Sequence, residues 1–599
     1  MELKYRKDVP VELTWDLSLI YDNDEMALAD MAALDKLANE IKAKYEGKIA
    51  NAKDINDCLD AYREIALKTT WVSCYTDLSV SVDYYDAKAK ELNEKVNALL
   101  ADVAARLAFI DSEILSLDEK IIAEAIDQSK DNKGYLRNLL RQKPHRLSKD
   151  NEEVLSALSN TLNSFYNIYN TCKLADIRFD SFEANGKSYP LAYSLFEDNY
   201  EYEKNAEVRR AAFKSFYQKI KEYENTTAVN YNCQVQMEKQ MAKIRGFDSV
   251  FDYLLYSQEI DCAYYDGHID TIMEKLAPHM RKYAKLKQRI HKLDKMTYAD
   301  LKISDDPDYD PSVTIEKSKD YIKEGLTILG EEYGKGIDRA YAERWVDFAN
   351  NLGKSTGGFC CFVPHKNCYV LLNWNNKMAD VFTLAHELGH CMNAMLSDKE
   401  HEIFDAQPHS FFGEGPSTTN EIIMASHLFK NSDDKRFRRW ILSNIVSKTY
   451  YHNFVTHFLE AYYQREVYRI IDKGGSVNAP MLSRIFRETL EKFWGDAVEI
   501  NEGAELTWMR QPHYYMGLYP YQYSAGLSLG TQMALRLEND STAIDGWMRF
   551  LKSGCTLDPK QVGELLGVDV FDLRTLESTI EYIGSLIDEI AKLTDELGL

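Results

Sequence analysis

The chain has 599 residues, of which 45% are hydrophobic and 28% are charged, a balance typical of a folded globular protein and not of a disordered or fibrous one. Its formal net charge is −23, and no basic stripe dense enough to neutralise a phosphate backbone interrupts the acidic chain. We therefore expect neither nucleic acid nor an anionic membrane as a partner.

The first residues, MELKYRKDVPVELTWDL, carry charges and lack the apolar core of a signal peptide. No stretch of about eighteen apolar residues predicts a transmembrane helix. The ten cysteines lie at irregular spacings in a long chain, which is typical of reduced thiols and not of a disulfide framework. These features predict a cytoplasmic protein.

Helical periodicity dominates the chain. In residues 92–117, LNEKVNALLADVAARLAFIDSEILSL, apolar side chains recur at steps of three and four residues, which predicts a helix. A β-hairpin is predicted at residues 175–193, where Asn185 and Gly186 supply the left-handed turn between two short runs. The acidic stretch KISDDPDYDPS at residues 302–312 predicts an exposed loop and a weakly marked boundary.

Residues 357–374, GGFCCFVPHKNCYVLLNW, are rich in aromatic and branched side chains and are interrupted by Gly, Pro and Asn, so we expect strands here. Residues 369–373 are predicted to form an edge strand that pairs with an extended peptide substrate. Gly357 and Gly358 would let the substrate backbone approach closely. The alternative is a purely structural hairpin.

The segment DVFTLAHELGHCMNAM, residues 380–395, contains an HExxH motif. At 3.6 residues per turn, His386 and His390 lie roughly 40° apart on one helix face, so both imidazoles can reach one metal ion. Glu387 lies beside them, where a carboxylate can take a proton from a water polarised by that ion. Gly389 in mid-helix costs ~1 kcal/mol relative to alanine unless another element approaches closely. The pattern indicates metal-assisted hydrolysis, with a chance match as the alternative.

A metal site of this kind needs a third ligand from elsewhere in the chain. The extended HExxHxxGxxH motif requires histidine at position 396, where this sequence has Leu396, so that class is excluded. Downstream, residues 411–429 offer Glu414 and Glu421, and Pro416 is suited to the first turn of a helix. On such a helix the two glutamates share a face, so one can bind the metal while the other orients a ligand histidine.

Together these motifs resemble the thimet-oligopeptidase-like zinc peptidases and, within them, the oligoendopeptidase F branch. The resemblance rests on HELGH at 386–390, EGPSTTNE at 414–421 and LTWMRQPHYYMGLYPYQYSAGL at 506–527, with TWDLSLIY at 14–21 as a looser match. The motifs span nearly the whole chain, and the set in this order is strongly specific.

The resemblance implies a mainly α fold in which a helical shell encloses a deep substrate channel, with a small β-sheet next to the HExxH helix. It implies that Glu414 is the third zinc ligand and that Glu421 orients a ligand histidine. It also places a histidine and several tyrosines over the bound peptide, to stabilise the oxyanion that forms when water attacks. By position these are His513 and some of Tyr514, Tyr519, Tyr521 and Tyr523. Of these we favour Tyr523, then Tyr519, as donors and Tyr514 as a substrate contact.

We therefore predict a zinc-dependent oligoendopeptidase that cleaves internal bonds of short peptides, with one Zn²⁺ per chain and Glu387 as the general base. Residues 1–195 are predicted to form an N-terminal helical region that ends in the hairpin, and residues 196–599 the catalytic region, the two packing as one body. One alternative is a metallocarboxypeptidase of similar architecture, in which Arg510 would hold the C-terminal carboxylate. The other is a non-catalytic peptide-binding protein.

Overall fold

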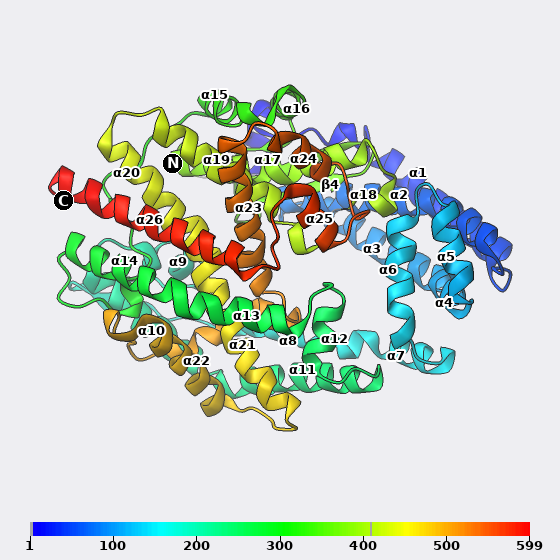
Figure 1. The fold of residues 1–599 in the computed structure, drawn as a ribbon, viewed down its shortest axis with the longest axis horizontal. Helices are drawn as coiled ribbons and strands as arrows, with labels where there is room; N and C mark the ends of the chain where they lie inside the picture. The colour runs from blue at the N-terminus through cyan, green and yellow to red at the C-terminus, as the bar shows by residue number, and fades with distance from the viewer. Residues whose placement is uncertain (1–3, 408–409) are drawn as a thin grey trace. The chain divides into compact units, whose positions relative to one another are not determined.

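Helices make up most of the structure, a computed structural model that describes residues 4–407 and 410–599 (Figure 1). Contacts within the chain divide it into two compact units. Unit 1 comprises the chain up to Arg146 together with residues 311–424 and 533–568, and unit 2 comprises residues 147–310, 425–532 and 569–599. Within the described ranges, no helix is both long and apolar enough to cross a membrane.

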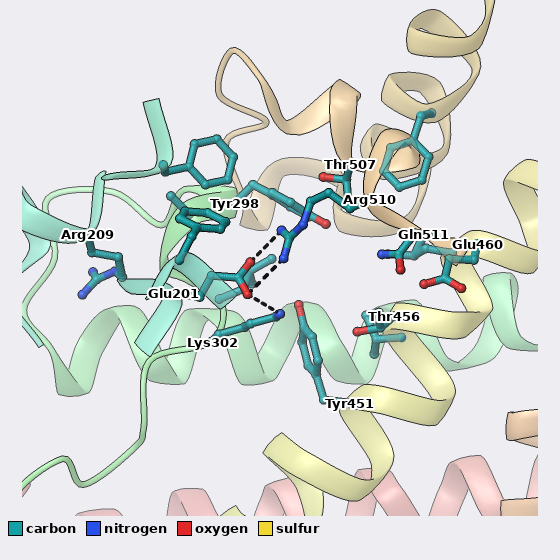
Figure 2. Close-up of a pocket in the computed structure, with 17 residues that line it drawn as sticks. Glu201, Arg209, Tyr298, Lys302, Tyr451, Thr456, Glu460, Thr507, Arg510 and Gln511 are labelled. Atoms are coloured by element: carbon teal, nitrogen blue, oxygen red, sulfur yellow. Dashed lines mark hydrogen bonds and ion pairs between the residues drawn. The ribbon is translucent and has the colours of Figure 1, made fainter. Parts of the chain in front are cut away.

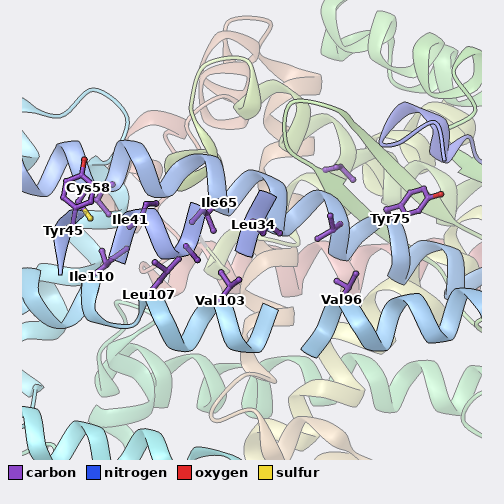
Figure 3. Packing of buried hydrophobic residues seen from close by; sticks show 14 of the residues in the cluster. Leu34, Ile41, Tyr45, Cys58, Ile65, Tyr75, Val96, Val103, Leu107 and Ile110 are labelled. Carbon is purple, nitrogen blue, oxygen red and sulfur yellow. The ribbon is translucent and has the colours of Figure 1, made fainter. Parts of the chain in front are cut away.

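Three long helices, α1 (Asp24–Tyr45), α2 (Ala52–Val82) and α3 (Ala87–Leu107), pack against one another in unit 1 (Figure 1). Apolar side chains at helical spacing meet between them, including Leu34, Ile65 and Val96 (Figure 3). Each such aliphatic side chain contributes about 1.5–3 kcal/mol when it is fully buried. The other helices of unit 1 are α4 (Phe109–Ser116), α5 (Glu119–Gln128), α6 (Lys133–Gln142), α15 (Ile315–Gly325), α16 (Glu331–Ala342), α17 (Met378–Asp398), α18 (Ile403–Ala406), α24 (Ala543–Leu551) and α25 (Pro559–Leu566).

A three-stranded sheet lies against α17 in unit 1. Its strand order is β3 (Val346–Asp347), β5 (Asn367–Leu371), β4 (Phe359–Val363), with β5 parallel to β3 and antiparallel to β4. Every residue of β5 is buried, and both β4 and β5 contact α17. The sheet therefore supports the helix that carries the HExxH motif.

Unit 2 contains the hairpin and most of the remaining helices. Strands β1 (Phe182–Ala184) and β2 (Lys187–Tyr189) pair antiparallel about Asn185 and Gly186, whose φ angles of 52° and 69° fit a two-residue turn. The helices are α7 (Lys149–Leu162), α8 (Ser164–Thr171), α9 (Tyr193–Asp198), α10 (Ala206–Lys221), α11 (Glu224–Ile244), α12 (Val250–Tyr256), α13 (Cys262–Thr271), α14 (Ala277–Ile290), α20 (Lys435–Asn444), α21 (His457–Asp472), α22 (Ala479–Trp494) and α26 (Leu573–Leu597).

Helix α26 packs along α14 and α20 in unit 2 (Figure 1). Two further helices have residues in both units: α19 (Gly415–Lys430) begins in unit 1, and α23 (Tyr521–Asn539) begins in unit 2. Each of these helices starts next to residues that the sequence singled out.

The mainly α fold, the hairpin and the small sheet beside the HExxH helix are confirmed. The hairpin strands are shorter than the predicted segment 175–193. The periodic segment 92–117 is divided between α3 and α4, with the break at Ala108. The predicted channel stays a prediction.

Two expectations are corrected. The predicted edge strand at residues 369–373 is wrong, because β5 pairs on both sides and the edges of that sheet are β3 and β4. The loop at 302–312 is only partly exposed: Asp305 is 3% exposed, and its carboxylate lies 3.2 Å from Nζ of Lys287. The boundary between the units at 310/311 falls in this loop, whereas the predicted boundary at 195/196 lies inside unit 2 and stays a prediction.

Candidate active site

Helix α17 buries its apolar side and keeps the motif histidines off that face. Val381, Leu384 and Leu388 are each 0% exposed. His386 and His390 are half-buried, and their ring centroids lie 5.0 Å apart. The spacing of the motif therefore places both imidazoles on one accessible edge of the helix.

Gly389 lets the start of α19 approach α17 closely. A Cβ at this position would lie 2.6 Å from Cα of Ser417 and 2.7 Å from the carbonyl oxygen of Pro416. Glu414 comes directly before α19, with Pro416 in the first turn as predicted. The expectation that this glycine marks a close backbone approach is confirmed, and the approach brings Glu414 to the histidines.

Three side-chain atoms form a candidate metal centre. The Nε2 atoms of His386 and His390 lie 3.4 and 3.5 Å from Oε2 of Glu414, and the three atoms lie within 4.8 Å of one another. These distances are too long for good hydrogen bonds. They match the separation of roughly 3.3–3.4 Å between two ligands bound at about 2.0–2.1 Å to a tetrahedral zinc ion. The donor set therefore fits zinc as it stands.

Glu421 fixes the orientation of His386. Its Oε1 lies 2.7 Å from Nδ1 of His386, so the carboxylate accepts that ring proton while Nε2 faces Glu414. Burial alone would lower the pKa of His386, but Glu421 and then Glu414 raise it to about 10. Two carboxylates therefore act on this imidazole.

The Glu414 carboxylate is held in its ionised form. Ser417 donates a hydrogen bond to Oε2 of Glu414 at 2.9 Å. Burial alone would raise the pKa of Glu414, but His390, His386 and Ser417 lower it to about 2. An ionised oxygen is the form that binds a divalent cation.

Glu387 is suited to accept a proton. Its side chain is 7% exposed, and burial raises the pKa of its carboxyl group, while His386 and His390 oppose that rise. A carboxylate whose pKa lies above its usual value is a better general base near neutral pH. The candidate base therefore sits between the two candidate ligands in sequence and on the same edge of the helix.

Gly357 and Gly358, predicted to bind substrate, precede β4. Gly357 has a φ of 80°, in the left-handed region that favours glycine, and its carbonyl accepts a hydrogen bond from Nδ2 of Asn373 at 3.1 Å. A Cβ on Gly358 would lie 3.3 Å from the carbonyl oxygen of Leu371. Both glycines thus have local structural reasons to be there, and peptide binding at this edge stays a prediction.

The predicted oxyanion donors gather in unit 2. His513 lies in the 3₁₀ turn Pro512–Tyr515, and its Nε2 is 3.3 Å from the hydroxyl of Tyr523 near the start of α23. The ring of Tyr519 is stacked on His513, with centroids 6.1 Å apart, and stands at 89° to the ring of Tyr523. All three residues are half-buried.

The neighbouring tyrosines are core residues. Tyr514 is 1% exposed, and its ring packs against Tyr231 and Tyr463. Tyr521 is 0% exposed, and its hydroxyl donates to Oε1 of Gln258 at 2.6 Å. The predicted substrate contact of Tyr514 stays a prediction.

Sequence analysis missed three residues next to His513. Oε2 of Glu460 lies 3.0 Å from Nδ1 of His513 and 3.1 Å from Nδ1 of His457, both within unit 2. Nε2 of His457 in turn lies 3.0 Å from Nε2 of His452. The stretch HNFVTHFLE carried a signal, because a histidine and a glutamate three residues apart share a helix face.

Three cysteines of unit 1 also come together. Sulfur atoms of Cys360, Cys368 and Cys391 lie within 4.8 Å of one another, and all ten cysteines of the chain are free thiols. Burial raises the pKa of Cys368 and of Cys391 well above the usual value. Neutral buried thiols of this kind behave as small apolar side chains.

Arg510, the candidate for holding a C-terminal carboxylate, is bound to internal partners. Its guanidinium donates to Glu197, Glu201 and the hydroxyl of Tyr217, each at 2.9 Å, and the residue is 7% exposed. Its nitrogens therefore offer no free bidentate face to a ligand.

Comparison with known proteins matches nearly the whole chain. A sequence model described as Peptidase family M3 matches residues 199–582, and one described as Oligopeptidase F matches residues 113–179. Oligopeptidase PepF of Bacillus subtilis (strain 168) is 28% identical over 99% of this chain and 89% of its own length. An Oligoendopeptidase F homolog of Borreliella burgdorferi is 28% identical over 98% of this chain and 99% of its own.

Solved structures share the fold. A crystal structure of a Chlamydophila abortus protein superposes with a TM-score of 0.87 at 23% identity and covers 99% of this chain and 100% of its own. The oligoendopeptidase-F of Enterococcus faecium gives a TM-score of 0.74 at 21% identity and covers 96% and 99%. At these identities the likeness concerns the fold alone.

Proposed function

The chain belongs to peptidase family M3, and on that premise we propose that it is a zinc-dependent oligoendopeptidase that cleaves internal bonds of short peptides. The resemblance to the oligoendopeptidase F branch is confirmed by the match to Oligopeptidase F and by the full-length relatives. The observation that carries the proposal is the pair of distances from Oε2 of Glu414 to Nε2 of His386 and of His390, which match those between zinc ligands.

We assign one Zn²⁺ per chain to His386, His390 and Glu414, with Glu421 orienting His386 through Nδ1. When bound, zinc would supply a Lewis acid that polarises a water molecule and the peptide carbonyl. Two imidazoles and one carboxylate are a ligand set typical of catalytic zinc. Cobalt or manganese accepts the same ligand types, so either ion is expected to substitute.

Glu387 takes a proton from the water that attacks the peptide carbonyl and later gives that proton to the leaving amine. Its burial and raised pKa support this role. General acid–base catalysis contributes roughly 10²–10⁴-fold to a rate, so replacing this carboxylate is expected to abolish most of the activity.

His513, Tyr523 and Tyr519 are assigned to the oxyanion. An imidazole or phenol that donates to the developing negative charge stabilises it by ~3–4 kcal/mol per donor. The assignment rests on the family resemblance, on the grouping of these side chains in unit 2 and on their partial exposure. The ten free thiols agree with a reducing compartment, and we place the protein in the cytoplasm.

A metallocarboxypeptidase is the second candidate, and a non-catalytic peptide-binding protein is the third. The internal partners of Arg510 remove the cation that the second candidate needed most. An intact set of candidate ligands with a candidate base beside it argues against the third.

Two peptides of about ten residues, identical except for a free or an amidated C-terminus, separate these candidates. An endopeptidase cleaves both at the same internal bonds, and a chelator stops the cleavage until zinc is returned. Trimming of the free peptide alone would identify a carboxypeptidase. Tight binding of both peptides without products would favour the binding protein.

A further inference from the structure

Glu460 is a buried carboxylate that the mechanism above does not use. It lies on α21 and is 1% exposed. A single oxygen, Oε2, faces Nδ1 of His513 at 3.0 Å and Nδ1 of His457 at 3.1 Å. A buried carboxylate stays ionised only when it has hydrogen-bond donors, and here the two imidazoles are those donors.

The ionised state of Glu460 determines where the imidazole protons lie. Burial alone would raise the pKa of Glu460, but His457 and His513 lower it to about 2. An ionised carboxylate only accepts hydrogen bonds, so both Nδ1 atoms must carry a proton. Nε2 of His513 is then the atom that faces the hydroxyl of Tyr523, at 3.3 Å. Carboxylate, imidazole and phenol form one continuous chain.

Glu460 also reaches Tyr523 by a second route. The ring of His457 is stacked on the ring of Tyr523, with centroids 3.9 Å apart and planes at 16°. The ring of His513 meets Tyr523 at 72°. Two imidazoles tied to one carboxylate therefore contact the same phenol, one at its face and one at its hydroxyl.

Hydrogen bonding explains this cluster better than a second metal ion does. His457, Glu460 and His513 have the composition of a metal site. The nitrogen–oxygen distances of 3.0 and 3.1 Å are those of charge-assisted hydrogen bonds.

Unit 2 contains a cavity of about 50 Å³ whose wall includes Glu201, Lys302 and Arg510 (Figure 2). Glu460 lines it, and its other oxygen, Oε1, makes no hydrogen bond with the protein. The cavity is large enough for water. Two cations in its wall, Arg510 and Lys302, are paired with Glu201, which accepts a hydrogen bond from Arg510 at 2.9 Å and one from Lys302 at 2.7 Å. The charge of Glu460 is thus directed at the two imidazoles.

We propose that Glu460 is a positioning residue that holds His513 and His457 in place and, through them, orients the hydroxyl of Tyr523. The proposal rests on the proposed function. The other titratable groups around this cluster are His452, His457, Lys173, Lys302, Tyr514 and Tyr519.

The test compares Glu460→Gln with Glu238→Gln. Glu238 is a matched control, because it is a buried glutamate of unit 2, 6% exposed, that accepts hydrogen bonds from Gln234 and Tyr468 and from no histidine. We expect Glu460→Gln to lower kcat about 10- to 100-fold at nearly unchanged KM, the range seen when a partner that orients a functional histidine is removed. Glu238→Gln should leave kcat unchanged.

The pH profile of kcat is the second readout. An amide can donate as well as accept, so the side chain introduced by Glu460→Gln no longer fixes the proton on Nδ1 of His513, and the profile should change in this variant only. A parallel fall of kcat, KM and thermal stability in both variants, with no change in profile, would reduce Glu460 to a structural residue and overturn the proposal.

A third readout does not depend on activity. Imidazole N–H protons that are hydrogen-bonded to a carboxylate resonate far downfield in proton NMR, and His513→Gln and His457→Gln assign them by loss. Both signals should be present in the wild type and absent in Glu460→Gln, with one zinc ion per chain in each protein. Signals that survive Glu460→Gln, or a second zinc ion that this variant loses, would contradict the assignment. A wild type that shows both signals but cleaves no peptide would count against the proposed function alone.

Discussion

Each unit contains two histidines around one glutamate, and the two clusters differ by a few tenths of an ångström. In unit 1 the carboxylate of Glu414 stands 3.4 and 3.5 Å from Nε2 of His386 and of His390. In unit 2 the carboxylate of Glu460 stands 3.0 and 3.1 Å from Nδ1 of its two histidines. The first spacing suits a cation between the ligands, and the second suits shared protons.

The backbone determines which of the two arrangements forms. In unit 1 Glu414 comes from the start of α19, whose approach to α17 is limited at Gly389, and Glu421 takes the Nδ1 proton of His386 and leaves Nε2 for a metal. In unit 2 Glu460 takes the Nδ1 protons itself. Residue composition alone therefore does not identify a metal site. What differs between these two clusters is the ring nitrogen that faces the carboxylate and its distance from the carboxylate oxygen.

The same substitution in both clusters should have different effects on zinc content. Glu414→Gln should lose zinc on dialysis and lower activity by about a thousandfold or more, because the ion supplies several kcal/mol of transition-state stabilisation. Glu460→Gln should keep one zinc ion per chain. The measurement is the zinc content of the two dialysed variants by elemental analysis. Equal zinc contents would contradict the assignment of a metal site to one cluster and a hydrogen-bonded group to the other.

Tyr523→Phe tests whether the hydroxyl of Tyr523 in unit 2 donates to the oxyanion. Loss of one oxyanion donor should lower kcat about 10²–10³-fold with little change in KM and none in zinc content. Tyr521→Phe is the control, because the hydroxyl of Tyr521 is bound to Gln258 inside the core. Steady-state kinetics on a blocked peptide tests this, and similar losses in both variants would show that the effect is structural.

Glu421→Gln tests whether Glu421 orients His386 for zinc binding. Zinc affinity should fall about 10–100-fold, because the amide does not fix the Nδ1 proton as the carboxylate does. The measurement is competition with a chelator of known affinity. Glu402→Gln is the control, since Glu402 lies 3.2 Å from Nε2 of His365, away from the candidate ligands. Unchanged affinity in Glu421→Gln would refute the orienting role.

Gly389→Ala has the smallest expected effect. Its Cβ would lie 2.6 Å from Cα of Ser417, so the start of α19 must shift, at a cost of ~1–3 kcal/mol. Gly334→Ala, in α16, meets nothing within 4 Å and should stabilise the helix by up to ~1 kcal/mol. Thermal unfolding should show shifts of opposite sign, and a stabilised Gly389→Ala would mean that the close approach is absent.

Local periodicity explains what could be predicted from the sequence. Four-residue spacing puts His386 and His390 on one helix face, and Pro416 marks the start of the helix next to Glu414. Asn185 and Gly186 fix the hairpin by their turn geometry. Each of these features depends on residues close together in the chain.

Long-range packing explains what could not be predicted. Glu460 meets His513 across 53 residues, through the packing of α21 against a 3₁₀ turn that leaves no periodic pattern. Strand β5 was expected at an edge because its parallel partner, β3, has only two residues and gives no strand signal. Both errors concern tertiary neighbours, which spacing along the chain does not encode.

The proposal of a zinc endopeptidase with Glu387 as its general base is tested most directly by peptide cleavage. The substrate is an internally quenched peptide of about ten residues, blocked at both ends, and the wild type is compared with Glu387→Gln. Products are read by mass spectrometry, and zinc content is measured in the same samples. We predict internal cleavage by the wild type, a loss of several orders of magnitude in Glu387→Gln, and one zinc ion per chain in both. Retained cleavage by Glu387→Gln, or no cleavage by a zinc-loaded wild type, would contradict it.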